Sequence, residues 1–419
     1  MLKINVLNVA TSVYGIVTAL ILGNIFLNLV YHPHDLLKPQ GNKFKVLTSG
    51  TEYPISDGVI YGFLPYWTIE EANYIQLSKL TDIAYFALQV EANGHIKKLG
   101  QDGNLDPGYN NWVNNETLNT LIAKSKRYGT RFALTIISHE ADISDQLLEC
   151  EKCWVNLKND LIDEMNKKEV KHLNLDFEYA TYTDPYYADQ YTKLTKYLNT
   201  ELDKEFGSSY VVVSTFADSA VKPRVTKPGD LAKVADGLFI MAYDFHRPNS
   251  DIAGPVAPLG GVLEEGREYD INTMLTDYLS LVPPSKMILG VPYYGYNWVV
   301  EDFAEYSPRL VGNDYIGYSQ SQKYEDIIDL KIELGIEDNW DEIAQVPYFS
   351  YVSEDTGSIR SVYYENERSL REKYKLAKKY ALGGVGIWAL GYDGGYQDLW
   401  ALLSDEFPHI LGTKAVAEN

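Results

Sequence analysis

The feature that most constrains the fold of this chain is a regular alternation between short apolar runs and longer amphipathic stretches. The apolar runs are rich in β-branched and aromatic residues, which is typical of β-strands. Stretches between them carry apolar residues at helical spacing. Strands that alternate with helices pair in parallel, because each helix returns the chain to the start of the next strand. The runs predict eight strands: VIYGFLP (59–65), DIAYFALQV (82–90), RFALTII (131–137), HLNLDFE (172–178), YVVVSTF (210–216), GLFIMAYD (237–244), KMILGVPYY (286–294) and GVGIWAL (384–390).

Eight strand–helix units favour an α/β fold of the closed (β/α)8 TIM-barrel type over an open sheet, and such a barrel needs about 250 residues. The chain has 419 residues, so additions are expected. The interval between the seventh and eighth strands is too long for one helix, and in it two strand-like runs flank the turn sequence EDTGS. We therefore predict a small α+β insertion at about 297–362, inside a barrel domain at 56–409 that is followed by a tail at 410–419.

The N-terminal segment has the composition of a membrane-spanning helix. From Ile4 to Tyr31 there is no Asp, Glu, Lys, Arg or His. A run of this length can cross the hydrocarbon core of about 30 Å as a helix. No small-residue cleavage site follows, which favours an uncleaved anchor at 1–31 over a removed signal peptide. Residues 32–55 mix Pro, Gly and polar residues without a period, and are expected to be a linker.

The charge of the chain excludes one class of partner. It carries 37 Lys and Arg against 58 Asp and Glu, a net charge of -21. Binding to a phosphate backbone depends on clustered Lys and Arg that release counterions. Nucleic acid is therefore not an expected partner.

The two cysteines, Cys150 and Cys153, lie in the sequence ECEKCW. A zinc site normally needs four ligands, and there is no second CxxC pair. The segment that follows them only loosely fits the helix of a thioredoxin-like redox motif. A local disulfide in a loop, in an oxidising compartment, explains the pair most simply. We predict no metal and no cofactor.

The stretch HLNLDFEYA (172–180) alternates apolar residues with Asn174, Asp176 and Glu178. On a water-facing strand this pattern would have no functional meaning. A barrel strand has no such face, because one side packs on helices and the other points into the barrel. Burying an amide and two carboxylates there is costly without a purpose. Glu178 would lie at the carboxyl end of its strand, where TIM barrels place their active sites.

The two carboxylates are expected to shift each other's pKa. Asp176 and Glu178 share a face of the strand, about 6 to 7 Å apart by strand rise. Two carboxylates in a low-dielectric site do not both ionise cheaply, so one keeps its proton near neutral pH. Glu178 is then the candidate general acid.

The stretch KHLNLDFE resembles the fourth-strand motif DxxDxDxE of glycoside hydrolase family 18, the chitinase-like barrels. Its last two acids match Asp176 and Glu178, whereas Lys171 and Asn174 replace the first two. An ending NxDFE looks like the spore-peptidoglycan N-acetylglucosaminidase branch of the family. The replacement of the deeper acid leaves open how Asp176 is protonated.

Four other stretches extend the resemblance over residues 56 to about 408: YGFLPYW (61–67) is similar to the first strand of the family, IMAYDFH (240–246) to the sixth, GVPYYGYNW (290–298) to the seventh and GVGIWALGYD (384–393) to the eighth. Taken singly, Trp388 is more often a core residue than a sugar platform, and Tyr243 or Met241 would be a core residue. Together, the stretches fall on the strands already assigned. The resemblance implies catalysis by Glu178, Asp176 and Tyr243, with substrate binding by Asn174, Met241, Asp244, Trp388, Tyr66, Phe86 and Tyr294.

The resemblance also implies the reaction, which is retaining, substrate-assisted hydrolysis of β-1,4 bonds next to N-acetylglucosamine. Chitin, peptidoglycan glycan and the chitobiose core of N-glycans all contain this sugar, and the sequence does not rank them. The alternative is a catalytically silent, lectin-like barrel, a class that arises when the acid is lost, whereas Glu178 is present here. A surface scaffold that only supports partners is a third, weaker reading.

The location expected from the substrate differs from that expected from charge. Lys38, Lys43 and Lys45 follow the apolar segment, and the positive-inside rule alone would keep the barrel inside the cell. The polysaccharide substrate favours the outside. We therefore expect a single-pass protein of the cell membrane with an extracellular catalytic domain.

Overall fold

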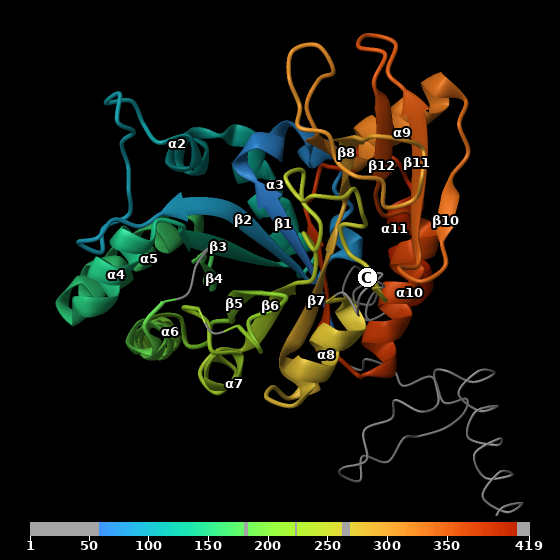
Figure 1. Ribbon diagram of the computed structural model, residues 1–419. Coiled ribbons are helices and arrows are strands. Elements are labelled where there is room, and N and C mark those ends of the chain that lie inside the picture. The colour runs from blue at the N-terminus through green and yellow to red at the C-terminus, as the bar shows by residue number, and fades with distance from the viewer. Residues whose placement is uncertain (1–57, 180–182, 223, 262–268, 409–419) are drawn as a thin grey trace, which may run out of the picture. The chain divides into compact units, whose positions relative to one another are not determined.

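The computed structural model describes residues 58–179, 183–222, 224–261 and 269–408 (Figure 1). The predicted anchor at 1–31, the linker at 32–55 and the tail at 410–419 lie outside the described residues. Among the helices of the described ranges, none combines the length and the apolar character that a membrane span requires.

A closed barrel of eight parallel strands forms the centre of the domain, as the alternation predicts. Its strands follow each other around the barrel in the order β1-β13-β7-β6-β5-β4-β3-β2. Sequential strands are thus neighbours, and β13 closes the ring against β1. The strands are β1 (Val59–Pro65), β2 (Asp82–Gln89), β3 (Arg131–Ser138), β4 (His172–Phe177), β5 (Val211–Phe216), β6 (Gly237–Met241), β7 (Met287–Pro292) and β13 (Gly384–Trp388).

Helices surround the barrel and cover the apolar outer face of its strands (Figure 1). Several begin at a side chain that caps the first turn, and Asn115, Asp184 and Asn366 each accept a hydrogen bond from a backbone N–H of that turn. The helices are α2 (Pro107–Asn114), α3 (Glu116–Arg127), α4 (Ala141–Glu149), α5 (Glu151–Lys168), α6 (Pro185–Phe206), α7 (Pro228–Leu231), α8 (Ile271–Leu279), α10 (Glu367–Lys379) and α11 (Asp398–Glu406), with 3₁₀ turns η1 (Tyr66–Tyr74), η2 (Leu77–Lys79) and η3 (Pro284–Lys286).

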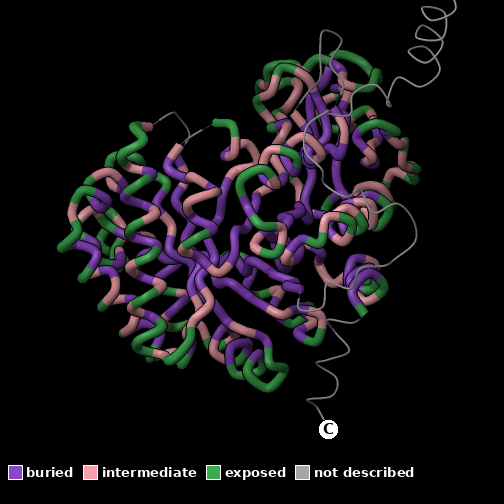
Figure 2. Tube along the Cα trace, turned by 90° about the horizontal axis from the view of Figure 1, so that it is seen from below, coloured by how far each residue is buried: buried purple, intermediate pink, exposed green. Residues whose placement is uncertain are grey.

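The barrel core has two layers, and buried residues gather in the centre of the trace in Figure 2. The larger layer lies between strands and helices. The smaller layer fills the barrel interior and includes Tyr61, Phe63 and Phe239. A Cβ at Gly386 would lie 2.2 Å from Cε2 of Phe239, so the strand carries glycine where that ring fills the barrel. The barrel is therefore a packed core, and only its carboxyl end is free for a site.

The expected insertion is present as a five-stranded antiparallel sheet in the order β10-β11-β12-β8-β9. The turn EDTGS joins β11 to β12, as predicted. The insertion begins earlier than expected, because the stretch assigned to the seventh strand is divided between β7 and the inserted β8, which starts at Tyr294. Its elements are β8 (Tyr294–Val299), β9 (Gln320–Lys323), α9 (Tyr324–Leu334), β10 (Asn339–Asp341), β11 (Val346–Val352) and β12 (Ile359–Tyr363).

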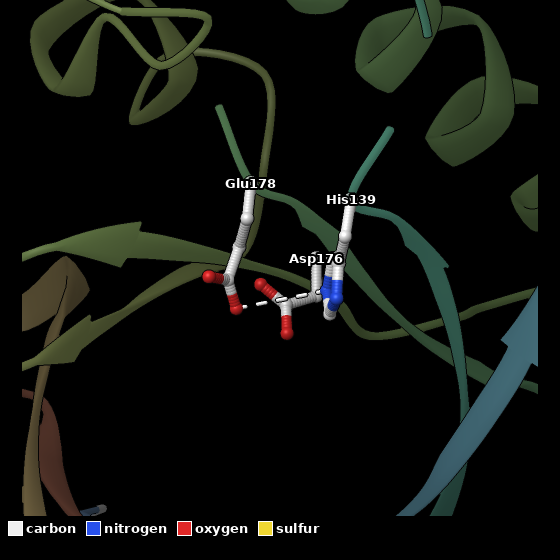
Figure 3. A group of neighbouring side chains, drawn as sticks. All are labelled: His139, Asp176 and Glu178. Carbon is white, nitrogen blue, oxygen red and sulfur yellow. Dashed lines mark ion pairs between the residues drawn. The ribbon is translucent and has the colours of Figure 1, made fainter. Parts of the chain in front are cut away.

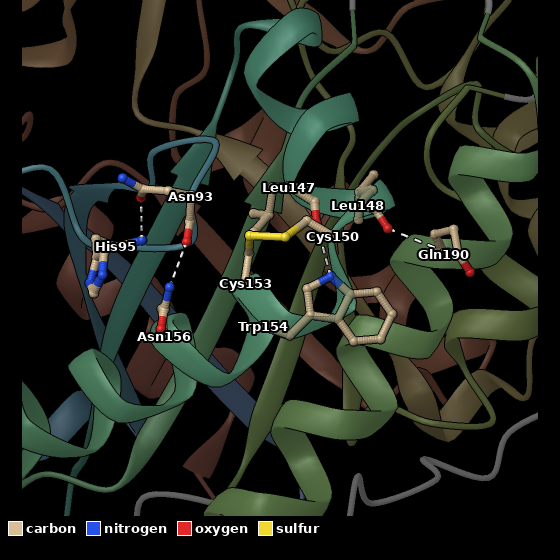
Figure 4. The surroundings of a disulfide bond; sticks show 9 residues. All are labelled: Asn93, His95, Leu147, Leu148, Cys150, Cys153, Trp154, Asn156 and Gln190. Atoms are coloured by element: carbon tan, nitrogen blue, oxygen red, sulfur yellow. Dashed lines mark hydrogen bonds between the residues drawn. A yellow bond between two sulfur atoms is a disulfide. The ribbon is translucent and has the colours of Figure 1, made fainter.

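Cys150 and Cys153 form a disulfide, as predicted (Figure 4). Cys150 lies at the junction between α4 and α5, not in a loop, and Cys153 belongs to the first turn of α5. The indole of Trp154 donates a hydrogen bond to the carbonyl of Leu147 at 3.0 Å across the same junction. The disulfide therefore joins two consecutive helices at their bend.

Candidate active site

Glu178 and Asp176 occupy the carboxyl end of β4, as the sequence predicts. The strand ends at Phe177, so Glu178 is the first residue beyond it. Its backbone N–H donates to the carbonyl of Ser138 on β3 at 3.1 Å, which extends the strand pairing by one residue. Asp176 is 3% exposed, whereas the Glu178 side chain is 32% exposed. The deeper carboxyl is thus enclosed and the outer one reaches the cavity.

The environment favours the protonated form of both carboxyls. Burial, reinforced by the negative charge of Glu178, raises the pKa of Asp176 well above its usual range, and the hydroxyl of Ser214 opposes this. Burial also raises the pKa of Glu178, although the positive charges of His139 and Arg247 oppose the rise. A pair of this kind titrates as a unit and retains a proton to higher pH than free carboxyls. It can act as a proton donor near neutral pH.

Asn174 is not among the residues that line the cavity, and its role in substrate binding stays a prediction. It is fully buried beneath Asp176. Its amide Nδ2 lies 3.3 Å from Oγ of Ser214 and 3.4 Å from the carbonyl of Val212 on β5. Asn174 therefore supports Ser214, and Ser214 in turn lies beside Asp176. The Asn174 amide lies beneath the cavity and is not part of its lining.

The segment after β6 supplies a second wall of the site. The strand ends at Met241, so Tyr243 and Asp244 lie beyond it and not within the strand predicted at 237–244. Met241, Tyr243 and Asp244 all line the cavity, as expected. Burial, together with the charges of Asp176 and Asp244, raises the pKa of Tyr243 well above its usual range. Its phenol therefore stays a neutral hydrogen-bond donor.

Trp388 forms an aromatic floor at the end of β13, as the resemblance implies. Its ring packs edge-on against Phe86 with centroids 4.7 Å apart, and lies 5.6 Å from Phe63. Trp388 and Phe63 line the cavity, whereas Phe86 stands behind Trp388 in the barrel interior. Tyr66 begins η1 and packs against the outer core. Neither Phe86 nor Tyr66 is among the cavity-lining residues, and their substrate contacts stay a prediction.

The cavity at this end of the barrel has a volume of about 640 Å³, enough for more than one sugar ring. Tyr294 of β8 lines it, as predicted, but comes from the inserted sheet and not from the seventh barrel strand. Asp218 and Asp244, the other carboxylates of its lining, are both engaged. Asp218 pairs with Arg224 at 2.5 and 3.0 Å and with Lys222 at 3.1 Å. Asp244 accepts hydrogen bonds from Tyr294 and Tyr296.

Sequence reasoning missed His139, Ser214 and the cationic side chains of the cavity. His139 directly follows β3, and Nε2 of its ring lies 3.6 Å from Oε1 of Glu178 (Figure 3). The rule that active sites gather at the carboxyl ends of barrel strands would have identified it. Lys222, Arg224 and Arg247 lie in segments after β5 and β6, where no sequence motif distinguishes them from surface residues.

His139, Asp176 and Glu178 bring one nitrogen and two carboxylate oxygens within 4.8 Å of one another (Figure 3). A metal ion on these atoms would require all three groups to be deprotonated. Burial favours the protonated form of both carboxyls, so we propose proton transfer by the carboxyl pair, with His139 as its neighbour, and not metal binding.

Comparison with known proteins agrees with the geometry. The sequence profile described as glycosyl hydrolases family 18 matches residues 59–393. Over 261 residues the chain is 26% identical to YdhD of Bacillus subtilis, a sporulation-specific glycosylase by name, and the match covers 61% of this chain and 56% of YdhD. The cortical fragment-lytic enzyme of Bacillus anthracis is 21% identical over 339 residues, 78% of this chain and 68% of the relative.

A solved structure gives the same fold. The spore cortex-lytic enzyme SleL of Bacillus megaterium superposes with a TM-score of 0.67 at 19% identity, and the match covers 88% of this chain and 78% of SleL. The barrel fold thus resembles that of a protein named for spore cortex.

Proposed function

The chain belongs to glycosyl hydrolases family 18, and we propose that it hydrolyses β-1,4 glycosidic bonds next to N-acetylglucosamine in peptidoglycan-type glycans or chitin. The observation that carries this proposal is the Asp176 and Glu178 pair at the open end of a packed barrel. Burial raises the pKa of both carboxyls, and the outer one faces a cavity with an aromatic floor.

Glu178 serves as the acid in the first half of the reaction and as the base in the second. Its proton goes to the departing glycosidic oxygen as the bond to the anomeric carbon breaks. The acetamido carbonyl oxygen of the substrate attacks that carbon and forms an oxazolinium ion. Glu178 then takes a proton from water as the water oxygen bonds to the anomeric carbon. The bond between that carbon and the acetamido oxygen breaks, which opens the oxazolinium ring and restores the acetamido group. Each step leaves Glu178 in the state that the next step requires.

Asp176 and Tyr243 hold the acetamido group in this proposal. Asp176 lies below Glu178 at the end of β4, and the carbonyl oxygen of its carboxyl can accept the amide N–H. The phenol of Tyr243 lines the same cavity as a neutral donor, suited to a carbonyl oxygen. Trp388 offers the apolar face on which a sugar ring can stack.

The other carboxylates support the assisted route. A conventional retaining glycosidase needs a second carboxylate about 5 Å from the first, free to bond to the sugar. Among the described cavity-lining residues, Asp218 is held by Arg224 and Lys222, and Asp244 by two tyrosine hydroxyls. Neither is free as a nucleophile.

Three cationic side chains, set among the carboxyls of the cavity lining, support a peptidoglycan-type substrate over neutral chitin. The chain as a whole carries a net charge of -21 and would repel an anionic polymer. Lys222, Arg224 and Arg247 nevertheless line the cavity. Lys222 and Arg224 share one carboxylate, so a positive charge remains for an anionic substituent. The names of YdhD, the cortical fragment-lytic enzyme and SleL point in the same direction.

We further propose that residues 1–31 anchor the protein in the cell membrane as a single span, with the barrel outside. The uncharged run from Ile4 to Tyr31 supports the span. The disulfide between Cys150 and Cys153 supports an oxidising compartment for the barrel. An extracellular position also gives access to the proposed glycan.

The test is to incubate the full-length chain with N-acetylglucosamine oligomers and with purified peptidoglycan glycan strands, and to measure the products by mass spectrometry. We expect both to be cut, the glycan strands faster. Glu178→Gln is the matched control and should bind without cutting. Binding of both glycans without new products from the wild type would replace the hydrolase with the lectin-like alternative.

A further inference from the structure

The pairing of β3 with β4 sets His139 beside Glu178. Ile137 pairs with Asp176 and Ser138 with Phe177 in the parallel register. The N–H of Glu178 donates to the carbonyl of Ser138, which continues this register past the end of β4. Adjacent strands lie about 4.8 Å apart, so the next residues on the two strands are neighbours. Their contact therefore follows from the barrel backbone.

The two side chains converge above Asp176 (Figure 3). His139 Nε2 lies 3.6 Å from Glu178 Oε1, and the functional atoms of His139, Asp176 and Glu178 lie within 4.8 Å of one another. The His139 side chain is 40% exposed, against 3% for Asp176. The imidazole is thus reached by solvent, as is the Glu178 side chain at 32%, whereas Asp176 is enclosed.

His139 opposes the effect of burial on Glu178. Burial raises the pKa of Glu178, and the positive charge of His139 is the strongest influence that lowers it, ahead of Arg247. The negative charge of Asp244 raises the pKa of Glu178. The titratable and charged groups that face Glu178 are Asp176 on β4, His139 after β3, and Tyr243, Asp244 and Arg247 after β6.

We propose that His139 is a positioning residue for the proposed hydrolysis, whose imidazolium holds the Glu178 carboxyl and balances its negative charge between the two proton transfers. The inference rests on the proposed function. No proton passes to or from His139 in the reaction: Glu178 gives its proton to the leaving oxygen and takes the next one from water.

The first test compares rates for the full-length chain and two variants on an N-acetylglucosamine oligomer. His139→Gln cannot become a cation, so the carboxylate of Glu178 loses its partner. We expect kcat to fall about 3- to 10-fold, as for a partly exposed charge pair, with KM unchanged within about twofold. The basic limb of the pH profile should move to higher pH, because Glu178 then keeps its proton longer. His139→Lys stays cationic and should hold that limb at or below its wild-type position.

The matched control is His95→Gln. His95 also pairs with a carboxylate, Asp160 on α5, at 3.0 Å, and is 51% exposed. This pair lies outside the cavity lining, so its loss should leave the pH profile unchanged. A shift of equal size in His95→Gln, or an unmoved limb in His139→Gln, would overturn the proposal.

A second measurement does not depend on turnover. The carboxyl of Glu178 can be titrated by NMR in glutamate-labelled full-length protein, with its signal assigned from its absence in Glu178→Gln. We expect Glu178 to titrate at higher pH in His139→Gln than in the wild type. Identical titrations would reject the role of His139. If the wild type cuts none of the glycans, the proposed function fails, and the carboxyl titration alone decides whether His139 controls Glu178.

Discussion

Tyr296 on the inserted strand β8 donates a hydrogen bond to Oδ1 of Asp244, 2.5 Å away and just beyond the barrel strand β6. Tyr294 donates to the same oxygen. Asp244 has a φ of 61°, a left-handed conformation that few residues other than glycine adopt. The inserted sheet thus holds the segment that carries Tyr243, and the insertion is part of the site.

Removing one of these donors should loosen that segment. Tyr296→Phe leaves the ring in place and deletes one hydrogen bond to a carboxylate, which is worth roughly 1.5–3 kcal/mol. We expect lower stability and a drop in kcat of about tenfold, because Tyr243 is less well placed. A double-mutant cycle with Asp244→Asn in urea unfolding should give a coupling of about 1 kcal/mol or more.

The control for this prediction lies in the same insertion. Tyr315 is 88% exposed, so Tyr315→Phe removes a hydroxyl that the site does not use. It should leave both stability and kcat unchanged. Additive effects of Tyr296→Phe and Asp244→Asn would show that the hydrogen bond does not couple the insertion to the rim.

Glu178→Gln should abolish turnover while preserving the fold and glycan binding. The amide keeps the shape of the side chain but has no proton to transfer. A single acid or base contributes about 10²- to 10⁴-fold, and here one residue serves both half-reactions, so the loss in kcat should reach the upper end or exceed it. Rates on an N-acetylglucosamine oligomer, with binding measured by calorimetry, check this. Wild-type turnover in the variant would remove Glu178 from the reaction.

Asp176→Asn should stabilise the protein while impairing catalysis. Burial raises the pKa of Asp176 in the folded state, so its contribution to stability is present at low pH and is lost as the pH rises through the folded value. The asparagine variant avoids this loss. The Tm difference between variant and wild type should therefore grow from pH 4 to pH 8, at about 2–4 °C per kcal/mol. A constant difference over this range would contradict the account.

Residues 56–409 should fold without the N-terminal segment, because the run from Ile4 to Tyr31 supplies none of the eight strands. Calorimetry of this fragment should show one cooperative transition, since barrel and insertion share the contacts at Asp244. Insolubility of the fragment, or separate transitions for the barrel and the inserted sheet, would contradict this prediction.

Most of the barrel could be predicted from the sequence because a strand and a helix have different apolar periods. The run HLNLDFE identified β4, and the carboxyl-end rule then located Glu178. The end of β7 was missed, because GVPYYGYNW is apolar and aromatic across the junction. Only the pairing partners show that Tyr294 belongs to the inserted sheet: it pairs with Lys323 and not with a barrel strand.

Three predicted site residues lie outside the cavity lining for a similar reason. Asn174, Phe86 and Tyr66 lie close to the site along the chain, but their side chains pack beneath or behind it. Periodicity assigns a face of a strand and not a depth along the barrel axis. His139 was missed because the carboxyl-end rule was applied to β4 and not to β3, whose last residue directly precedes it.

The measurement that tests the central claim most directly is the anomeric configuration of fresh products, followed by NMR, set beside rates on a matched substrate deacetylated in the subsite before the cleaved bond. The account predicts net retention by two inversions on the acetylated substrate and no turnover on the deacetylated one, because Asp176 and Tyr243 then have no acetamido group to hold. An inverted product, or comparable cleavage of the deacetylated sugar, would contradict substrate assistance by the Asp176 and Glu178 pair.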